Sequence, residues 1–126
     1  MKRIINTPDA PAAVGAYSQA TTDGDLVFTA GQIALTPDGT FLDDEPIDVQ
    51  CRQCLENIKN IVEEEGLTMQ DVLKVNVYLE DISQFDEMNE AYAEYFQDNP
   101  PARSAIGVDA LPKGAAIEIE AIAAKR

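Results

Sequence analysis

Helical and extended periodicities alternate along this chain of 126 residues, and this alternation limits the fold more than any other feature of the sequence. Apolar side chains recur at helical spacing over residues 46–66 and 83–96, which predicts two amphipathic helices. Residues 72–79 instead alternate apolar and polar side chains, as a strand does. The other strand-like segments are residues 2–6, 17–21, 26–34, 103–108 and 116–124. The order β-β-β-α-β-α-β-β predicts an α+β fold with six strands.

Turn and cap residues support several of these boundaries. Asp23 and Gly24 stand between two strand-like segments, which is a strong hairpin signal. Gly66 follows the first helical segment and predicts a left-handed C-cap. Ser83 and Asp86 have the spacing of a capping box, so we expect the second helix to begin at Ser83.

Two helices can cover only one face of a sheet, which leaves the opposite face in need of a partner. The segment 26–34 carries apolar or small residues on both faces, Val27 and Phe28 among them, so we expect both faces to be covered. A homo-oligomer that packs these faces together is the simplest solution. No linker or internal repeat interrupts the chain, which predicts one domain over residues 1–126.

The charge balance excludes several partners. There are 23 acidic and 9 basic residues, giving a net charge of −14. Such a protein repels nucleic acid and anionic membranes. The acidity is either a general surface property suited to a high-salt cytoplasm or that of an ordinary acidic protein. No apolar segment is long enough to span a bilayer and no signal-peptide core is present, so we expect a cytoplasmic protein.

The residue types most used for metal binding are scarce. The chain has no histidine, and its two cysteines, Cys51 and Cys54, cannot complete a four-ligand zinc site alone. Both cysteines lie on the apolar stripe of the first helix. We therefore interpret them as buried thiols, and we expect neither a metal nor a cofactor.

One arginine stands out as a candidate ligand anchor. Arg103 follows two prolines at the start of a strand, and a rigidly held guanidinium matches the two oxygens of a small carboxylate. A surface ion pair is the alternative. Glu118 and Glu120 share one face of the last strand, where either could be a solvated residue or a partly buried acid/base group.

Three further residues have both a structural and a functional interpretation. Tyr17 stands at the mouth of the hairpin and could be a core or interface tyrosine. Gly31 lies inside a strand pattern, which often marks the close approach of a ligand or another chain. Asn89 borders the apolar stripe of the second helix and could simply be solvated. From the residues alone, the chain is a small α/β oligomer that binds a small carboxylate.

Several segments together resemble the RidA (YjgF) family of reactive intermediate/imine deaminases. They are A-P-A-A-V-G-A-Y-S-Q-A, T-A-G-Q-I, N-E-A-Y, P-A-R-S and L-P-K-G-A-A-I-E-I-E-A-I-A, and the likeness runs nearly end to end. The resemblance implies a chorismate-mutase-like fold, with a mixed sheet and two helices on one face, assembled as a homotrimer with sites between subunits. It also implies hydrolysis of 2-imino acids such as 2-iminobutanoate and 2-iminopropanoate to 2-oxo acids and ammonia, which protects pyridoxal-phosphate enzymes. No cofactor or metal is implied.

The resemblance assigns roles to residues that match the family's motifs. Arg103 corresponds to the carboxylate-binding arginine, and Glu118, rather than Glu120, to the carboxylate that holds the attacking water. Tyr17 corresponds to an aromatic wall, Gly31 to a backbone contact with the ligand, and Asn89 to a polar lining residue. The chain departs from the family in two places, because Ala30 replaces a common serine and Ala105 a common cysteine.

Three alternatives remain open at this point. The first is a non-catalytic module on the same fold that binds or senses a 2-oxo acid or another small carboxylate. The second is a ribonuclease or translation inhibitor, which the net charge of −14 disfavours. The third is a chorismate mutase, which needs more cationic groups around a dianion than this chain offers.

Overall fold

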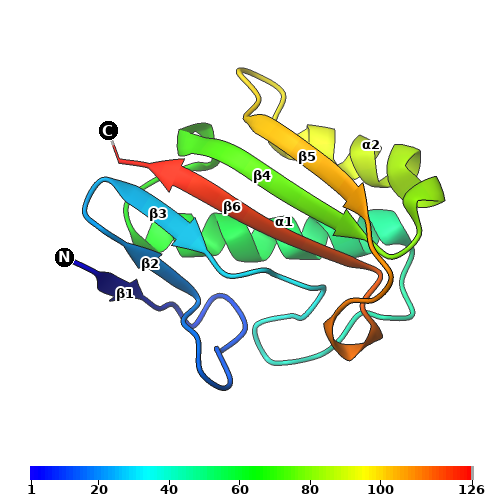
Figure 1. Cartoon of the computed structure of the whole chain (residues 1–126), viewed down its shortest axis with the longest axis horizontal. Coiled ribbons are helices and arrows are strands. Elements are labelled where there is room, and N and C mark those ends of the chain that lie inside the picture. Colours follow the sequence, from blue (N-terminus) through cyan, green and yellow to red (C-terminus); the bar gives the residue numbers. More distant parts are fainter. Residues whose placement is uncertain (126) are drawn as a thin grey trace.

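The computed structural model describes residues 1–125 and contains a mixed six-stranded sheet with two α-helices packed against one face (Figure 1). The strands are β1 (Arg3–Ile5), β2 (Ala20–Thr22), β3 (Leu26–Thr29), β4 (Val72–Leu79), β5 (Ala102–Gly107) and β6 (Ile117–Ala124), and the helices are α1 (Ile47–Glu64) and α2 (Phe85–Tyr95). The predicted element order is confirmed. Across the sheet the order is β1-β2-β3-β6-β4-β5; β4 and β5 run parallel, and the other neighbours are antiparallel.

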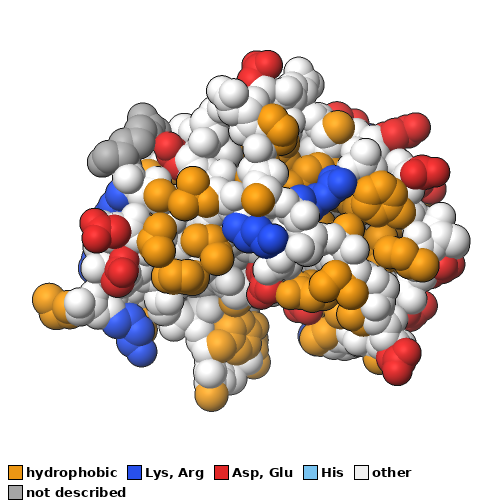
Figure 2. All heavy atoms as spheres, turned by 45° about the horizontal axis from the view of Figure 1, so that its top comes forward, with side chains coloured by type: hydrophobic (Ala, Val, Ile, Leu, Met, Phe, Trp, Pro, Cys, Tyr) orange, Lys and Arg blue, Asp and Glu red, His pale blue; other side chains and the backbone are white. Residues whose placement is uncertain are grey.

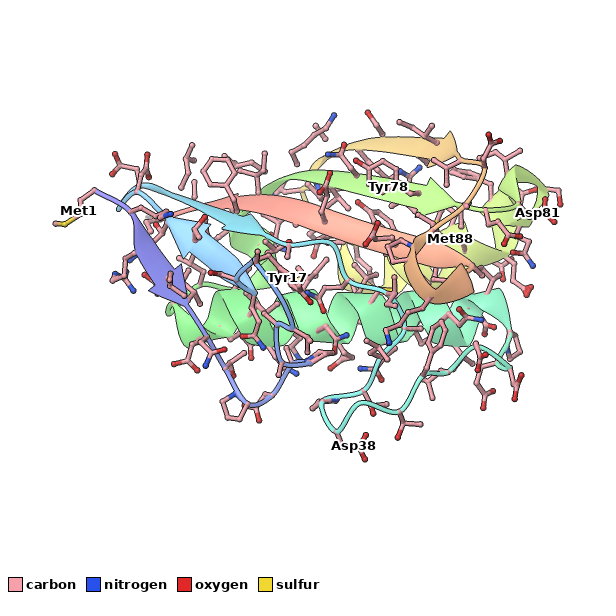
Figure 3. The ribbon with its side chains drawn as sticks, turned by 60° about the horizontal axis from the view of Figure 1, so that its bottom comes forward. Met1, Tyr17, Asp38, Tyr78, Asp81 and Met88 are labelled. Atoms are coloured by element: carbon pink, nitrogen blue, oxygen red, sulfur yellow. The ribbon has the colours of Figure 1, made fainter. Side chains whose placement is uncertain are left out.

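The core lies between the sheet and the helices, and Figure 3 shows these two layers edge-on with α1 along one side of the sheet. Fully buried side chains come from α1 (Cys51, Cys54, Leu55, Ile58, Ile61, Val62), β4 (Val75, Val77, Leu79) and β6 (Ile117, Ile119). Each leucine or isoleucine buried in this way contributes about 1.5–3 kcal/mol of transfer free energy. The helical and alternating periodicities of the sequence therefore converge on one apolar layer.

Both cysteines are free thiols inside this core, as the sequence predicts. Burial raises the pKa of Cys51 to about 12, and burial likewise raises the pKa of Cys54. Because the thiolate is the reactive form, neither residue is poised for redox or nucleophilic chemistry.

The end of α1 agrees with the prediction. Gly66 has a φ of 79°, in the left-handed region. The N–H of Leu67 donates to the carbonyl of Val62, and that of Gly66 donates to the carbonyl of Glu63, which is the Schellman pattern.

The predicted start of the second helix is wrong. Ser83 and Asp86 form no capping box; the Asp81 carboxylate accepts hydrogen bonds from the N–H and hydroxyl of Ser83 instead. This interaction caps a single 3₁₀ turn, Ile82–Gln84, and α2 starts only after it. Asp81 therefore accepts the N–H of Ser83, which in the predicted box would have bonded to the side chain of Asp86.

Two predicted strands are shorter or shifted in the structure. The segment 26–34 is a strand only as far as Thr29, whose hydroxyl accepts the N–H of Ala121. The N–H of Ala30 then turns away from β6 to donate to the carbonyl of Gln19, and backbone pairing with β6 resumes at Gln32. The segment 17–21 is displaced to Ala20–Thr22, so Tyr17 lies in a loop.

The sheet face opposite the helices is open, as the sequence predicts. Four large apolar side chains are exposed over this region: Ile4, Phe28, Leu73 and Ile106. Figure 2, which views this side obliquely, shows hydrophobic side chains over much of the surface and acidic ones mainly toward its periphery. The expectation that both faces of β3 are covered is therefore not met within one chain. Over residues 1–125, no helix is long and apolar enough to cross a bilayer.

Candidate functional site

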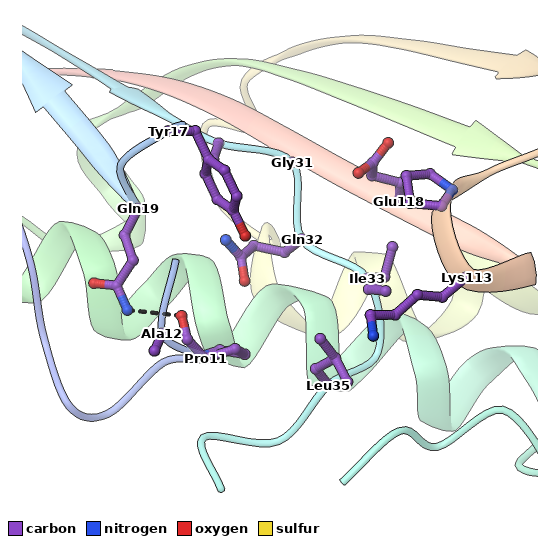
Figure 4. Close-up of a pocket in the computed structure, with 12 residues that line it drawn as sticks. Pro11, Ala12, Tyr17, Gln19, Gly31, Gln32, Ile33, Leu35, Lys113 and Glu118 are labelled. Carbon is purple, nitrogen blue, oxygen red and sulfur yellow. Dashed lines mark hydrogen bonds between the residues drawn. The ribbon is translucent and has the colours of Figure 1, made fainter. Parts of the chain in front are cut away.

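A cavity of about 390 Å³ opens where the loop around Tyr17, the segment after β3 and the turn before β6 meet (Figure 4). Its lining includes Tyr17, Gly31, Gln32, Lys113 and Glu118. Three of the sequence-predicted site residues, Tyr17, Gly31 and Glu118, are thus brought together. Tyr17 is 56% exposed, which rules out the interpretation as a core tyrosine.

Glu118 supplies the titratable carboxylate of this cavity. It is half-buried, and burial raises its pKa, with the nearby charge of Glu120 adding to the effect. Among residues 1–125, no group donates a hydrogen bond to its carboxylate. A partly desolvated, unpaired carboxylate with a raised pKa is suited to exchange protons with a bound water.

Gly31 makes room for this carboxylate. A Cβ atom at position 31 would lie 2.7 Å from Oε2 and 2.8 Å from Cδ of Glu118, closer than non-bonded atoms approach. The glycine in the T-A-G-Q segment is therefore required by the packing of Glu118 against the backbone, and its own φ is not in the left-handed region.

Glu120 has a different environment on the same strand face. Its Oε2 accepts hydrogen bonds from the Tyr78 hydroxyl at 2.6 Å and from the Asn76 amide at 3.2 Å. The hydrogen bond to this carboxylate raises the pKa of Tyr78 to about 12. With two partners in place, Glu120 is a structural member of the open sheet face, whereas Glu118 is free to meet a ligand.

Arg103 lies in a second group of residues, on β5 and α2. Its Cζ is 5.2 Å from the ring centroid of Phe85 and 4.7 Å from that of Tyr92, and its Nη1 donates to Oδ1 of Asn89 at 2.6 Å. Cation–π contacts of this kind contribute roughly 0.5–2 kcal/mol each. Within residues 1–125 Arg103 forms no salt bridge, so the surface ion-pair interpretation is wrong for the described chain.

The two groups do not meet within one chain. Arg103 is in register with Val75, whose side chain is buried under the helices, and Glu118 is in register with Tyr78 on the opposite, open face. In addition, β4 lies between β5 and β6. The arginine therefore presents its free donors beside α2, and the carboxylate faces a cavity on the other side of the sheet.

Sequence reasoning missed several residues of these two groups. Phe85 and Tyr92 belong to the apolar stripe predicted over residues 83–96, and they share with Asn89 an i, i+4, i+7 spacing that places all three on one helical face. Lys113 lines the cavity with a φ of 59°, an unusual conformation for a residue with a side chain. Ala30 also lines the cavity, so the departure from the family's serine falls within the site. Among residues 1–125, no group of three or more acidic or cysteine side chains is placed to hold a metal ion.

Comparisons with known proteins show which family the chain resembles. The family model described as "Endoribonuclease L-PSP" matches residues 7–125. A RutC family protein of Pyrococcus horikoshii is 50% identical over 125 residues, covering 99% of both chains. A protein of Rattus norvegicus named 2-iminobutanoate/2-iminopropanoate deaminase is 43% identical over 123 residues, covering 98% of this chain and 90% of its own.

Solved structures give the same result. The crystal structure of Escherichia coli TdcF with bound serine superposes with a TM-score of 0.93 at 40% identity, covering 98% of this chain and 99% of TdcF. The match extends over the sheet, both helices and the segments that carry the two groups of site residues. The chain belongs to the RidA/YjgF/L-PSP family.

Proposed function

We propose that this protein hydrolyses reactive 2-imino acids and their enamine tautomers, such as 2-iminobutanoate and 2-iminopropanoate, to 2-oxo acids and ammonia. The observation that carries the proposal is the unpaired, half-buried carboxylate of Glu118, whose pKa is raised and which borders the cavity beside Gly31. The Rattus norvegicus relative, which is 43% identical in sequence, is named for the same deaminase reaction, and this supports the proposal. The function in the cell is then removal of imines released by pyridoxal-phosphate enzymes before they damage such enzymes.

The reaction needs a water molecule and no cofactor. Glu118 accepts a proton from the water as its oxygen adds to C2 of the protonated imine, which gives a carbinolamine. Glu118 then returns that proton to nitrogen and takes the hydroxyl proton as the tetrahedral carbon collapses. The C–N bond breaks, and the 2-oxo acid and ammonia are released, the ammonia leaving with this last proton as ammonium. A protonated imine is already electrophilic, so positioning the water and the substrate supplies most of the catalysis.

We further propose that Arg103 and Asn89 of one subunit complete the cavity that Tyr17, Gly31 and Glu118 form in another. The clamped guanidinium of Arg103 keeps donors free for a substrate carboxylate, and Asn89 holds its orientation. Since these groups occupy opposite faces of the sheet in one chain, a shared site requires a second copy. The exposed apolar side chains of the open face favour a homo-oligomer, which we propose is a trimer.

The direct test generates the imine in situ with a dehydratase or an amino-acid oxidase and follows release of the 2-oxo acid. Wild-type protein should accelerate release over the spontaneous reaction, and Glu118→Gln and Arg103→Ala should remove that acceleration. Glu120→Gln is the matched control, because it changes a neighbouring carboxylate on the same face. Absence of acceleration by the wild type would favour the alternative of a module that binds 2-oxo acids without turnover.

A mixing experiment tests whether the site is shared between subunits. Glu118→Gln and Arg103→Ala chains are unfolded together and refolded as mixed oligomers. In random mixtures about a quarter of shared sites receive both intact residues, so activity returns to about that fraction of wild type. A site built from one chain would give no recovery. Sedimentation equilibrium gives the number of subunits.

Ribonuclease activity is the second candidate, because the family model carries the description of an endoribonuclease. The net charge of −14 opposes binding of the phosphate backbone. RNA cleavage that persists at high salt and disappears in Arg103→Ala would establish this activity.

A further inference from the structure

We propose that Gln32 determines which substrate side chains this site accepts, and that it favours 2-imino acids whose side chain carries a hydroxyl or an amide. The inference rests on the proposed function, since it concerns the same cavity. It assigns a recognition role to a residue on the wall of the cavity opposite the carboxylate.

The first observation is an amide that has no partner within the described part of the protein and is open to the cavity. Gln32 is only 7% exposed and lines the cavity, yet its side-chain amide makes no hydrogen bond to any of residues 1–125. Its backbone is fixed, because its N–H donates to the carbonyl of Ile119 at 2.8 Å and its carbonyl accepts the N–H of Ile119 at 3.0 Å. The amide therefore stays at the cavity and has its hydrogen-bonding capacity available to whatever enters.

The second observation is the contrast with Gln19, another buried glutamine of the same cavity. The Gln19 amide is fully used: it accepts the N–H of Thr7 at 2.7 Å and donates to the carbonyls of Thr7 at 3.0 Å and Pro11 at 2.8 Å. Gln19 thereby holds the loop that forms one wall. Of these two amides, one is structural, and Gln32 is left for a ligand.

The third observation is the direction of the side chain. In Figure 4 the Gln32 side chain extends toward Tyr17 and Pro11, whereas Glu118 lies on the other side of Gly31. A ligand whose reacting carbon lies at the carboxylate can thus extend its own side chain toward Gln32.

The rest of the lining restricts the chemistry at this end. The side chains of Ala12, Ile33 and Leu35 offer only carbon atoms, and beside the Tyr17 hydroxyl Gln32 offers one acceptor oxygen and two donor hydrogens. A hydroxyl or amide, which both donates and accepts, satisfies this amide. An aliphatic side chain long enough to reach Gln32 instead displaces water from the amide and leaves it unpaired, which is costly, whereas a short one leaves it in contact with water. An unpaired amide of this kind discriminates between polar and aliphatic substrate side chains more strongly than the shape of an apolar pocket alone does.

The experiment compares two imines of nearly equal shape, generated from asparagine and from leucine by an amino-acid oxidase. We expect the ratio of kcat/KM for the asparagine imine to that for the leucine imine to fall about tenfold in Gln32→Met, the loss expected for one hydrogen bond. Gln97→Met is the matched control, because Gln97 is exposed on the surface, and it should leave the ratio unchanged. An unchanged ratio in folded Gln32→Met would overturn the inference.

Binding of stable ligands separates this inference from the proposed reaction. Calorimetric titration with 3-hydroxypyruvate and 2-oxobutanoate, which differ by a hydroxyl in place of a methyl, should show a preference for the hydroxyl that Gln32→Met removes. If that preference holds while imine hydrolysis is absent, the reaction is wrong and the recognition role stands. If hydrolysis is present and the preference is absent, the reaction stands and the role of Gln32 is wrong. Should Gln32→Met fail to fold, Gln32→Glu keeps the shape and removes the amide donors, with a change in the same ratios expected.

Discussion

Replacing Gly31 by alanine tests the link between backbone shape and chemistry most directly. The added Cβ would lie 2.7 Å from Oε2, 2.8 Å from Cδ and 3.0 Å from Cγ of Glu118, all inside ordinary contact distance. The glutamate must swing away by about 1 Å, because the backbone on both sides of Gly31 is held: Ala30 bonds to Gln19 and Gln32 bonds to Ile119. A misplacement of that size costs about a hundredfold in rate. Since a flexible side chain absorbs the strain, the free energy of unfolding should fall by only about 0.5–1.5 kcal/mol.

The assay is steady-state hydrolysis of an imine generated in situ, measured across pH. In the wild type, burial raises the pKa of Glu118. As the pH is lowered, the rate should therefore begin to fall at a higher pH than it would if Glu118 had the pKa of an ordinary glutamate. A displaced and better solvated carboxylate in Gly31→Ala has a lower pKa, so this fall should move to lower pH while kcat drops.

Gly107→Ala is the control for that experiment. Its new Cβ would lie 3.2 Å from Cβ of Ile82, an exposed apolar side chain away from the cavity. We expect little change in rate. A Gly31→Ala protein that retains kcat within about threefold of wild type would refute the argument that Gly31 sets the position of Glu118.

Three further predictions concern stability and reactivity. Arg3 and Lys125 both pair with Glu65 and lower its pKa to about 2, below its ordinary value. The stabilisation from these pairs is therefore present above about pH 5 and is lost as the pH falls toward 2. Glu65→Gln should lower the free energy of unfolding in urea by about 1 kcal/mol at pH 7, a solvent-screened value, and weaken its decrease at acid pH. Gly66→Ala should cost about 1–2 kcal/mol by chemical denaturation because of the positive φ, with Gly66→Asn costing less. The two core cysteines should resist an aromatic disulfide reagent in the native protein and react fully in denaturant; rapid native labelling would contradict their burial.

The parts of the fold that are local in sequence could be predicted. The alternation of Val72–Leu79 and the Schellman end at Gly66 depend on neighbours a few residues away, and both are confirmed. Ser83 was a misleading signal because Asp81, two positions earlier, accepts both the N–H and the hydroxyl of Ser83. The end of β3 at Thr29 depends on a hydroxyl that bonds to Ala121, more than ninety positions away, and no local pattern shows such a contact.

The candidate site was predicted as a set of residues but not as an arrangement. Chain order places Arg103 and Glu118 on consecutive strands, which suggests neighbours across a turn. In the sheet, β4 lies between their strands, and Arg103 is in register with Val75 whereas Glu118 is in register with Tyr78, so the two side chains fall on different faces. The environment of Gln32 was also hidden, because an unpaired amide can be recognised only once every potential partner has a position.

The place of β6 in the sheet has a consequence for how the protein is made. β6 follows the other five described strands in the chain and pairs with β3 on one side and β4 on the other, so within residues 1–125 it joins two halves of the sheet that otherwise share no strand pairing. Until it emerges from the ribosome, the nascent chain carries a β1-β2-β3 meander and a β4-β5 pair, each with an unpaired edge open to other chains. Folding is therefore completed only once β6 has emerged, and a chain that lacks β6 leaves both edges exposed and is prone to aggregate.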